Sequence, residues 1–337
     1  FRYVDSGQHA AFTRSLRQAF DVGEPDASLR EGGGDIVSVT SAIGWYLKCL
    51  WKSTFQRSWL RERIFPGGGV CLIHGDTLST LLGMQLARRA GLKVAHVEAG
   101  LRSYRIWDPF PEELIRIRCM RKSHVLFTPS EEAMRNLQAM KVPGRIVEAG
   151  GNTVADSLRL ASRRAASIEI PEGPFALATC HRLETITRKD RLERVVSLMN
   201  RVAEDLPVVF VTHKPTRRYL ERFNLTEKLH AGVTQMDMLD YWDFVAMQKA
   251  SRLVLSDGGS IQEECAYLGK PCLIIRKTTE RPDGVGTNAT LWAYDNAVAE
   301  TFLKETLSTT PAEADELPRP SARIVDVLIE MGYATPE

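Results

Sequence analysis

The chain has 337 residues, and 44% of them are hydrophobic, which is enough apolar material for two packed domains. Its 44 basic and 42 acidic side chains give a formal net charge of +2, and this near balance argues against a nucleic-acid partner held by bulk charge. Its apolar stretches stay well short of the roughly 20 residues that a membrane helix needs, so we expect no membrane partner.

Short apolar runs alternate with stretches of helical periodicity, a pattern typical of α/β architecture. Phe1 to Val4 already has the character of a strand, so we expect the first strand and helix of this domain to precede Phe1 in the complete protein. In the rest of the first half we expect strands at 70–73, 94–97 and 125–128 and a helix at 78–90. In the second half we expect strands at 175–179, 208–212, 253–256 and, as the final strand, 272–275, with helices at 190–204 and 260–268.

A polar, weakly patterned stretch at 162–173 is the best candidate for a linker between two domains. We therefore expect an N-terminal domain at 1–165 and a C-terminal domain at 166–337. The last helix is assigned to the second domain, with the alternative that it packs back on the first.

The six cysteines form no C-x-x-C pair, and several lie in apolar runs, where a free thiol behaves as a small hydrophobic group. We therefore expect no disulfides and a cytoplasmic protein. No cluster of His, Cys and Asp has the spacing of metal ligands, and the glycine triplets at 32–34 and 67–69 are neither a P-loop nor a dinucleotide fingerprint. We expect neither a metal nor a cofactor.

Carboxylates follow two of the predicted strands. Asp76 lies in His-Gly-Asp-Thr after the first strand, and Glu98 lies in Val-Glu-Ala-Gly after the second. Because the carboxyl ends of parallel strands meet at one edge of a sheet, where ligands bind, these acids indicate proton-transfer chemistry. Asp76 has a structural alternative as the cap of the following helix. Glu98 has no evident capping role, which favours a function.

Two further acids, Glu112 and Glu113, follow Pro109 and Pro111. Acids in a first helical turn complement the helix dipole, and this structural interpretation is strong for Glu113. For Glu112 the functional and structural interpretations are balanced. Arg116 stands four residues later, at a spacing where it can hold Glu112 as an ion-pair partner.

The second half carries groups that suit an anion. His181 and Arg182 follow a strand, and such a pair can bind phosphate oxygens. Gly258, Gly259 and Ser260 join a strand to a helix, whose first N–H groups are open to an anion. One turn later, Glu264 can accept from ribose hydroxyls, with a solvated helix carboxylate as the alternative. Arg281, before Pro282, is either a phosphate ligand or a surface loop charge.

At these motifs the chain resembles the UDP-N-acetylglucosamine 2-epimerases. The shared motifs are His-Gly-Asp-Thr at 74–77, Val-Glu-Ala-Gly-Leu-Arg at 97–102, Pro-Glu-Glu at 111–113, Gly-Asn-Thr-Val at 151–154, His-Arg-x-Glu at 181–184, Gln-Glu-Glu at 262–264, Leu-Gly-Lys-Pro at 268–271 and Thr-Thr-Glu-Arg-Pro at 278–282. The resemblance implies an α/β fold of two Rossmann-like domains facing a central cleft, the glycosyltransferase-B arrangement. It also implies a homodimer with no metal or nicotinamide.

Site residues carried over from the family fall into three groups. The acid/base carboxylates correspond to Asp76, Glu98 and Glu112, and a catalytic, phosphate-contacting residue to His181. The substrate-binding set comprises Arg116, Arg182, Phe244 beside the uracil, Gly258, Gly259, Ser260, Glu264 at the ribose and Arg281 near the phosphates. A second, activating site is associated with Gln8, His9 and His213.

The implied reaction inverts C2 of UDP-N-acetylglucosamine to give UDP-N-acetylmannosamine, by elimination of UDP and its re-addition to a 2-acetamidoglucal. Three alternatives remain open at this point. The chain is a related epimerase acting on another sugar, such as a sugar phosphate, or a hydrolysing epimerase that releases N-acetylmannosamine and UDP. The third alternative, from a different class, is a sugar-nucleotide binding protein without chemistry.

Overall fold

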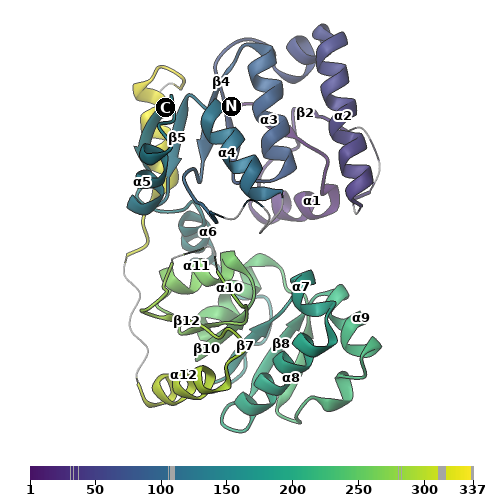
Figure 1. Ribbon diagram of the computed structural model, residues 1–337, viewed down its shortest axis with the longest axis vertical. Coiled ribbons are helices and arrows are strands. Elements are labelled where there is room, and N and C mark those ends of the chain that lie inside the picture. Colours follow the sequence, from purple (N-terminus) through teal and green to yellow (C-terminus); the bar gives the residue numbers. More distant parts are fainter. Residues whose placement is uncertain are drawn as a thin grey trace. The chain divides into compact units, whose positions relative to one another are not determined.

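The computed structural model describes residues 1–30, 32, 34–36, 38–104, 106, 111–279, 281, 283–309 and 316–334. The chain forms two compact units (Figure 1): unit 1 comprises Phe1–Thr153 with Pro318–Glu337, and unit 2 comprises Val154–Leu317. Each unit contains a parallel sheet with helices, so the α/β fold class expected from the sequence is confirmed. No helix in the described ranges is long and apolar enough to cross a membrane.

The division falls before the polar stretch at 162–173 that the sequence indicated. Helix α6 (Val154–Ala161) contacts α10 (Tyr241–Ala250) and α11 (Gly259–Tyr267), which places it in unit 2. At the other end of the chain, α13 (Pro320–Glu330) belongs to unit 1, because its residues Ile324, Val327 and Leu328 pack with the buried side chains of the first sheet. The packing of apolar faces therefore determines where the chain passes from one unit to the other, before α6 and before α13. The polarity of the sequence did not indicate these positions.

Unit 1 is built on a four-stranded parallel sheet. Its strands, in spatial order, are β3 (Val70–His74), β4 (Lys93–Val97), β5 (Val125–Thr128) and β6 (Arg145–Glu148). Helices α3 (Leu78–Ala90), α4 (Glu112–Lys122) and α5 (Glu131–Ala139) connect them. Helix α3 begins where Thr77 and Thr80 cap each other reciprocally and ends at Gly91, whose φ of 89° suits glycine. All four strands run in the same direction, so their carboxyl ends share one edge.

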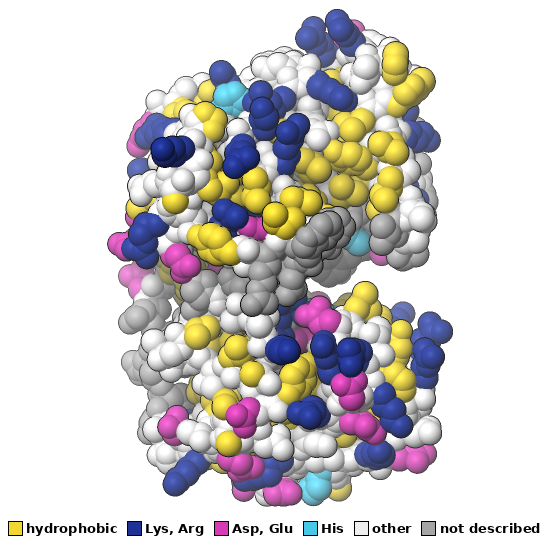
Figure 2. Space-filling view, in the orientation of Figure 1, with side chains coloured by type: hydrophobic (Ala, Val, Ile, Leu, Met, Phe, Trp, Pro, Cys, Tyr) yellow, Lys and Arg dark blue, Asp and Glu magenta, His cyan; other side chains and the backbone are white. Residues whose placement is uncertain are grey.

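The beginning of unit 1 forms a separate pair of strands, β1 (Val4–Asp5) and β2 (Ala27–Ser28). Helices α1 (Ala10–Ala19) and α2 (Val39–Phe55) and a π-helical turn, η1 (Trp59–Ile64), complete this region. Large apolar side chains are exposed on α2 at four-residue intervals: Ile43, Leu47, Trp51 and Phe55. Figure 2 shows exposed hydrophobic side chains on the part of unit 1 where Figure 1 places α2 and α3.

Unit 2 is built on a six-stranded parallel sheet. Its spatial order is β12 (Ala289–Leu291), β11 (Cys272–Ile274), β10 (Leu253–Ser256), β7 (Ala176–Thr179), β8 (Val208–Thr212) and β9 (Val233–Asp237). The expectation that the strand near 272–275 is the last one is wrong, because the three-residue β12 pairs with β11 at the sheet edge. From β7 the chain moves to β8 on one side, while β10 lies on the other side of β7. The carboxyl ends of β7 and β10 therefore flank a topological switch point, where ligands bind in open α/β sheets.

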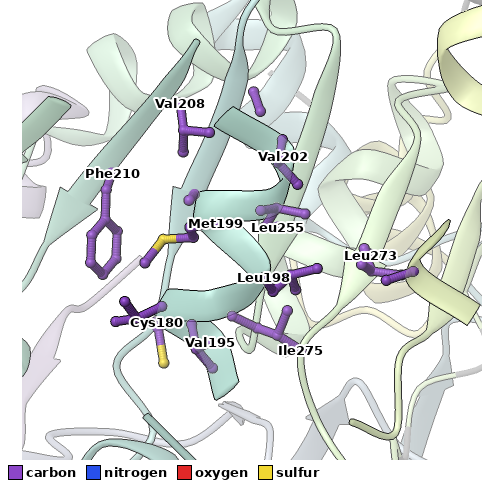
Figure 3. Packing of buried hydrophobic residues seen from close by; sticks show 14 of the residues in the cluster. Cys180, Val195, Leu198, Met199, Val202, Val208, Phe210, Leu255, Leu273 and Ile275 are labelled. Carbon is purple, nitrogen blue, oxygen red and sulfur yellow. The ribbon is translucent and has the colours of Figure 1, made fainter. Parts of the chain in front are cut away.

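Helices cover this sheet and close its core. They are α7 (Leu183–Ile186), α8 (Lys189–Ala203), α9 (Lys214–Arg222), α10, α11 and α12 (Asn296–Ser308), with a 3-10 turn, η2 (Thr226–Lys228). In Figure 3, apolar side chains of α8, among them Val195 and Met199, lie against strand residues such as Phe210 and Leu255. This packing fixes the strand ends from which the functional loops depart.

Candidate functional site

Glu98 stands at the end of β4 in an unusual backbone conformation. Its φ of 63° lies in the left-handed region, which costs a non-glycine residue roughly 1 kcal/mol or more and is concentrated at functional sites. Its side chain is only 10% exposed, Oε1 accepts a hydrogen bond of 2.8 Å from Asn152 Nδ2, and Oε2 lies 3.9 Å from His74 Nδ1. The strained backbone and the amide of Asn152 together aim this carboxylate at the strand-end edge of unit 1.

Asp76 follows β3 at the same edge and forms an ion pair with Arg116 of α4. The cap of α3 is Thr77, so the alternative that Asp76 caps this helix is wrong. In the described part of the chain, the carboxylates within ion-pair distance of Arg116 are those of Asp76 and Glu113, the latter at 3.6 Å. The expected pairing of Arg116 with Glu112 is therefore also wrong, because a tertiary contact with the β3 turn takes its guanidinium.

The two acids at the start of α4 have opposite surroundings. Glu113 is fully buried and accepts from Arg102 Nε and, at 3.0 Å, from the Ser103 N–H. Burial alone would raise the pKa of Glu113, but these hydrogen bonds and the charges of Arg102 and Arg116 lower it below its usual value. This confirms a structural role for Glu113.

Glu112 begins α4, and its Oε2 is buried without a hydrogen-bond partner among the residues that the structure describes. The preceding motif residues Pro109 and Phe110 lie outside the described residues. A carboxylate oxygen that no described donor occupies can exchange a proton with a ligand. Asp76, Glu98, Glu112 and Arg116 are called the carboxylate cluster below.

A histidine that no sequence motif singled out supports the carboxylate cluster. His96 of β4 is buried, and its Nε2 lies 2.8 Å from the carbonyl oxygen of Gly75. Burial lowers the pKa of His96 to about 4, so the ring is neutral near pH 7 and Nε2–H donates to this carbonyl. The bond holds the Gly75–Asp76 turn against β4. Only burial distinguishes this residue from any other histidine, so no sequence signal could have identified it.

In unit 2, the ends of β7 and β10 are tied together by Asp257. This carboxylate is 0% exposed and accepts from the N–H groups of His181, at 3.0 Å, and Arg182, at 2.9 Å. The His181 ring is 37% exposed, and its Nδ1 lies 3.2 Å from Asp257 Oδ1. The predicted His-Arg pair therefore leaves the sheet at the switch point with its side chains partly open to solvent.

Three cationic or ionisable side chains surround the start of α11. A Cβ added to Gly259 would lie 2.9 Å from Arg281 Nε and 3.9 Å from Arg182 Nη2, and one added to Gly258 would lie 3.2 Å from His181 Cε1. Only glycine leaves room for this approach. The first N–H groups of α11 have no acceptor within the helix, so the loop presents helix N–H groups and two guanidiniums to an anion. His181, Arg182 and Arg281 around this helix start are called the basic cluster below.

The predicted residues of unit 2 differ in their surroundings. Arg281 forms an ion pair of 2.5 Å with the buried Glu263. Glu264 is buried, and burial raises its pKa to about 7, although hydrogen bonds from Tyr241 and Gln248 oppose the shift. Phe244 of α10 is half-buried against the core of the sheet. Ser260 is exposed in the first turn of α11. Glu280 and Pro282 of the last motif lie outside the described residues.

The three residues expected at a second site are divided between the units. Gln8 and His9 belong to unit 1, where Gln8 Oε1 accepts a hydrogen bond of 2.6 Å from Ser79 Oγ and His9 is exposed at the start of α1. His213 belongs to unit 2, where its ring centroid lies 4.9 Å from that of His181. Burial lowers the pKa of His213. Within unit 2, His213 therefore adjoins the basic cluster.

These groups can transfer protons in unit 1 and bind an anion in unit 2. In unit 1, carboxylates meet a guanidinium at the carboxyl ends of parallel strands. In unit 2, guanidiniums meet a helix N-terminus at a switch point. The described residues contain no group of three or more His, Cys, Asp and Glu side chains that could hold a metal ion.

Comparison with known proteins connects both units to one family. The profile of the family described as UDP-N-acetylglucosamine 2-epimerase matches residues 1–315. A UDP-N-acetylglucosamine 2-epimerase of Methanocaldococcus jannaschii is 33% identical over 241 residues, which is 67% of this chain and 65% of that protein. The chain thus spans somewhat less than two thirds of that relative in the matched alignment.

A second relative and a solved structure extend the comparison. The UDP-2,3-diacetamido-2,3-dideoxy-D-glucuronate 2-epimerase of Pseudomonas aeruginosa is 33% identical over 270 residues, covering 77% of this chain and 74% of that protein. The crystal structure of M. jannaschii UDP-GlcNAc 2-epimerase in complex with UDP-GlcNAc and UDP superposes on this chain with a TM-score of 0.79 at 26% sequence identity. The superposition covers 97% of this chain and 91% of the M. jannaschii chain.

Proposed function

Because the chain belongs to the UDP-N-acetylglucosamine 2-epimerase family, we propose that it is an isomerase that inverts C2 of UDP-N-acetylglucosamine to give UDP-N-acetylmannosamine. The observation that carries this proposal is the carboxylate cluster, in which Glu98 is held in a strained, left-handed backbone conformation beside the turn that bears Asp76. Left-handed backbone at a non-glycine residue is concentrated at functional sites, and a proton-transferring carboxylate must be aimed accurately.

The proposed chemistry starts from a C2–H bond that is too weakly acidic for direct removal. Departure of UDP from C1 makes the C2 proton far more acidic, and one carboxylate then removes it to give a 2-acetamidoglucal. Protonation of C2 from the opposite face and re-addition of UDP to C1 complete the inversion. The reaction needs at least two carboxylates in different protonation states. The carboxylates of Asp76, Glu98 and Glu112 are proposed to share these two roles.

The basic cluster is proposed to receive the diphosphate of UDP. As the C1–O bond breaks, negative charge collects on the departing phosphate, and preorganised donors stabilise it most effectively. Arg182, Arg281 and the first N–H groups of α11 are such donors, with His181 beside them. Phe244 is proposed to lie beside the uracil and Glu264 to accept from the ribose hydroxyls. Several separate donors on the leaving group support C–O cleavage before or together with proton loss.

One relative supports a second candidate substrate. The P. aeruginosa enzyme named for UDP-2,3-diacetamido-2,3-dideoxy-D-glucuronate is as similar to this chain as the enzyme named for UDP-N-acetylglucosamine. The two sugars share the acetamido group at C2, where the chemistry occurs, and differ at C3 and C6. The carboxylate and basic clusters would serve both in the same way.

Product analysis by proton NMR tests the proposed function. The purified protein is incubated separately with UDP-N-acetylglucosamine, with UDP-2,3-diacetamido-2,3-dideoxy-D-glucuronate and with N-acetylglucosamine 6-phosphate. We expect an equilibrium mixture of UDP-N-acetylglucosamine and UDP-N-acetylmannosamine. Free N-acetylmannosamine with stoichiometric UDP would instead identify a hydrolysing epimerase. Turnover of the sugar phosphate alone would assign another substrate, and binding of all three without turnover would contradict an enzyme.

A homodimer and a cytoplasmic location are also proposed from the family resemblance. So is a second, activating site that includes Gln8, His9 and His213. The exposed position of His9 and the bond between Gln8 and Ser79 are compatible with ligand contact at this part of unit 1. Sedimentation of the purified protein measures its assembly. Initial rates at increasing UDP-N-acetylglucosamine test activation, which would give a sigmoidal dependence.

A further inference from the structure

The carboxylate of Asp257 makes several polar contacts with the turn that follows β7, called the β7 turn below. Asp257 follows β10, yet its Oδ2 accepts from the Cys180 thiol at 3.2 Å, from the His181 N–H at 3.0 Å and from the Arg182 N–H at 2.9 Å. Its Oδ1 lies 3.0 Å from the same His181 nitrogen. One carboxylate thus holds three successive residues that are separated from it by 75 to 77 positions in the sequence.

The position of these bonds in the sheet gives them their importance. Strands β7 and β10 are neighbours, but the chain leaves them toward opposite sides of the sheet, so no short connection fixes one turn relative to the other. The β7 turn carries His181 and Arg182. The β10 turn carries Gly258 and Gly259 at the start of α11. Asp257 therefore joins the two loops that together form the basic cluster.

The bonds also decide which donors remain for a ligand. Because Asp257 occupies the backbone N–H groups of His181 and Arg182, those groups are not available to an anion. An anion at this position would therefore meet the His181 ring, the first N–H groups of α11 and the Arg182 guanidinium, which lies 3.7 Å from Glu184 Oε1. The buried carboxylate is satisfied at this position by three donors, the Cys180 thiol and the N–H groups of His181 and Arg182. If this carboxylate were altered, the turn could rotate, and the ring and guanidinium would move with it.

We propose that Asp257 is a positioning residue for diphosphate binding, which sets the β7 turn so that His181 and Arg182 face the anion received at the start of α11. The inference rests on the proposed function and adds a residue to it. Asp257 does not contact the substrate. It acts through the backbone of His181 and Arg182 and through its proximity to His181 Nδ1.

The variant Asp257→Asn tests the inference. It preserves the size of the side chain but replaces one carboxylate oxygen by an NH2 group, which cannot accept a hydrogen bond from the N–H groups of the β7 turn. Titration calorimetry measures the Kd values of UDP, inorganic pyrophosphate and uridine. We expect the Kd values of UDP and pyrophosphate to rise about tenfold or more, which corresponds to roughly 1.4 kcal/mol per tenfold. The Kd of uridine, which has no phosphate, should stay within about twofold of wild type. A general loss of structure would instead weaken all three ligands.

Asp243→Asn is the matched control. Asp243 is also buried in unit 2 and also accepts from a backbone N–H and a side chain, both belonging to Ser167, but it lies on α10. The Asp243→Asn variant should lower thermal stability by about as much as Asp257→Asn does, but it should leave the affinity for pyrophosphate unchanged. Equal pyrophosphate Kd values for wild type and Asp257→Asn, or equal losses in both variants, would overturn the inference. Failure of the wild type to bind UDP would instead contradict the proposed function itself.

A measurement on the wild type covers the case in which Asp257→Asn does not fold. Amide resonances are followed by NMR while pyrophosphate is added. The Gly259 and Ser260 N–H resonances should shift strongly, because these groups are open to the anion. The His181 and Arg182 N–H resonances should shift much less, because Asp257 keeps them. Larger ligand-induced shifts at His181 and Arg182 than at Gly259 and Ser260 would contradict the inference.

Discussion

The carboxylate cluster of unit 1 and the basic cluster of unit 2 hold their charges in different ways. In unit 1, Glu98 is strained, Glu112 has an oxygen without a donor among the described residues, and Asp76 relies on one guanidinium. In unit 2, Asp257 and the Arg281–Glu263 pair are buried with several partners each. The acids proposed to transfer protons thus have few hydrogen-bond or ion-pair partners each, whereas the groups proposed to form the anion site are fixed by several buried partners. Variants in the two clusters should therefore differ in what they impair.

The largest effect is expected from the carboxylates. Asp76→Asn, Glu98→Gln and Glu112→Gln should each lower kcat by about 100-fold or more, the usual scale for acid–base groups. Thermal stability should change little by comparison. Glu112→Gln should also release 2-acetamidoglucal and UDP, since leaving-group departure does not need the second proton transfer. Initial rates and NMR of the products measure both effects, and near-wild-type turnover in all three variants would make these carboxylates structural.

The next effect concerns stability and pH in unit 2. Burial raises the pKa of Glu264 from 4.5 to about 7, so the folded state binds a proton that the unfolded state has released. The contribution of this group to stability is therefore fully present below about pH 4.5 and is lost as the pH rises to about 7, by on the order of 3 kcal/mol. Urea unfolding between pH 5 and 8 measures this slope. Glu264→Gln should flatten it, and an unchanged slope in that variant would contradict the assignment.

A smaller effect is expected from the cations of the basic cluster. Arg182→Gln should raise the Kd of UDP by roughly tenfold, because one charge-assisted contact with the diphosphate is lost. The control is Arg188→Gln, which removes an exposed arginine of the same unit that pairs with Asp190. Calorimetry at two salt concentrations should show a weaker salt dependence for Arg182→Gln alone. Equal behaviour of the two variants would exclude Arg182 from the anion site.

The smallest effect measures the strain at Glu98 directly. Glu98→Gly and Glu98→Ala lose the same carboxylate and the same bond to Asn152, but glycine tolerates a φ of 63° and alanine does not. The glycine variant should be about 1 kcal/mol more stable than the alanine variant. Lys141, which also has a positive φ of 50°, offers the same comparison away from the carboxylate cluster. Equal unfolding free energies for both Glu98 variants would mean that no strain is stored there.

Much of the fold could be predicted from local sequence. Helix α3 occurs at the expected residues because its apolar spacing ends at Gly91, and the strands that were predicted are apolar runs between turns. Strands β6 and β9 were missed because charged and polar residues interrupt them, and β12 was missed because three residues carry no periodicity. The domain boundary was displaced because the contacts of α6, rather than its composition, assign it to unit 2.

The candidate site could be predicted only where a motif stood beside a strand end. Asp76, Glu98 and His181 have that signal. Arg116 was given the wrong partner, because its contact with Asp76 spans 40 residues and helical spacing suggested Glu112. The contacts of Asp257 could not be predicted for the same reason, since its hydrogen-bond partners lie about 75 residues earlier in the sequence. Side chains that act through distant backbone groups leave no trace in local spacing.

Deuterium incorporation tests the central claim most directly. The protein is incubated with UDP-N-acetylglucosamine in deuterated water, and C2 of the epimerised product is observed by proton NMR. The carboxylate mechanism predicts one solvent deuterium at C2 of each UDP-N-acetylmannosamine formed, since one acid removes the proton and another, exchanged with solvent, returns it. Epimerised product that keeps its original hydrogen at C2 would contradict the two-carboxylate account.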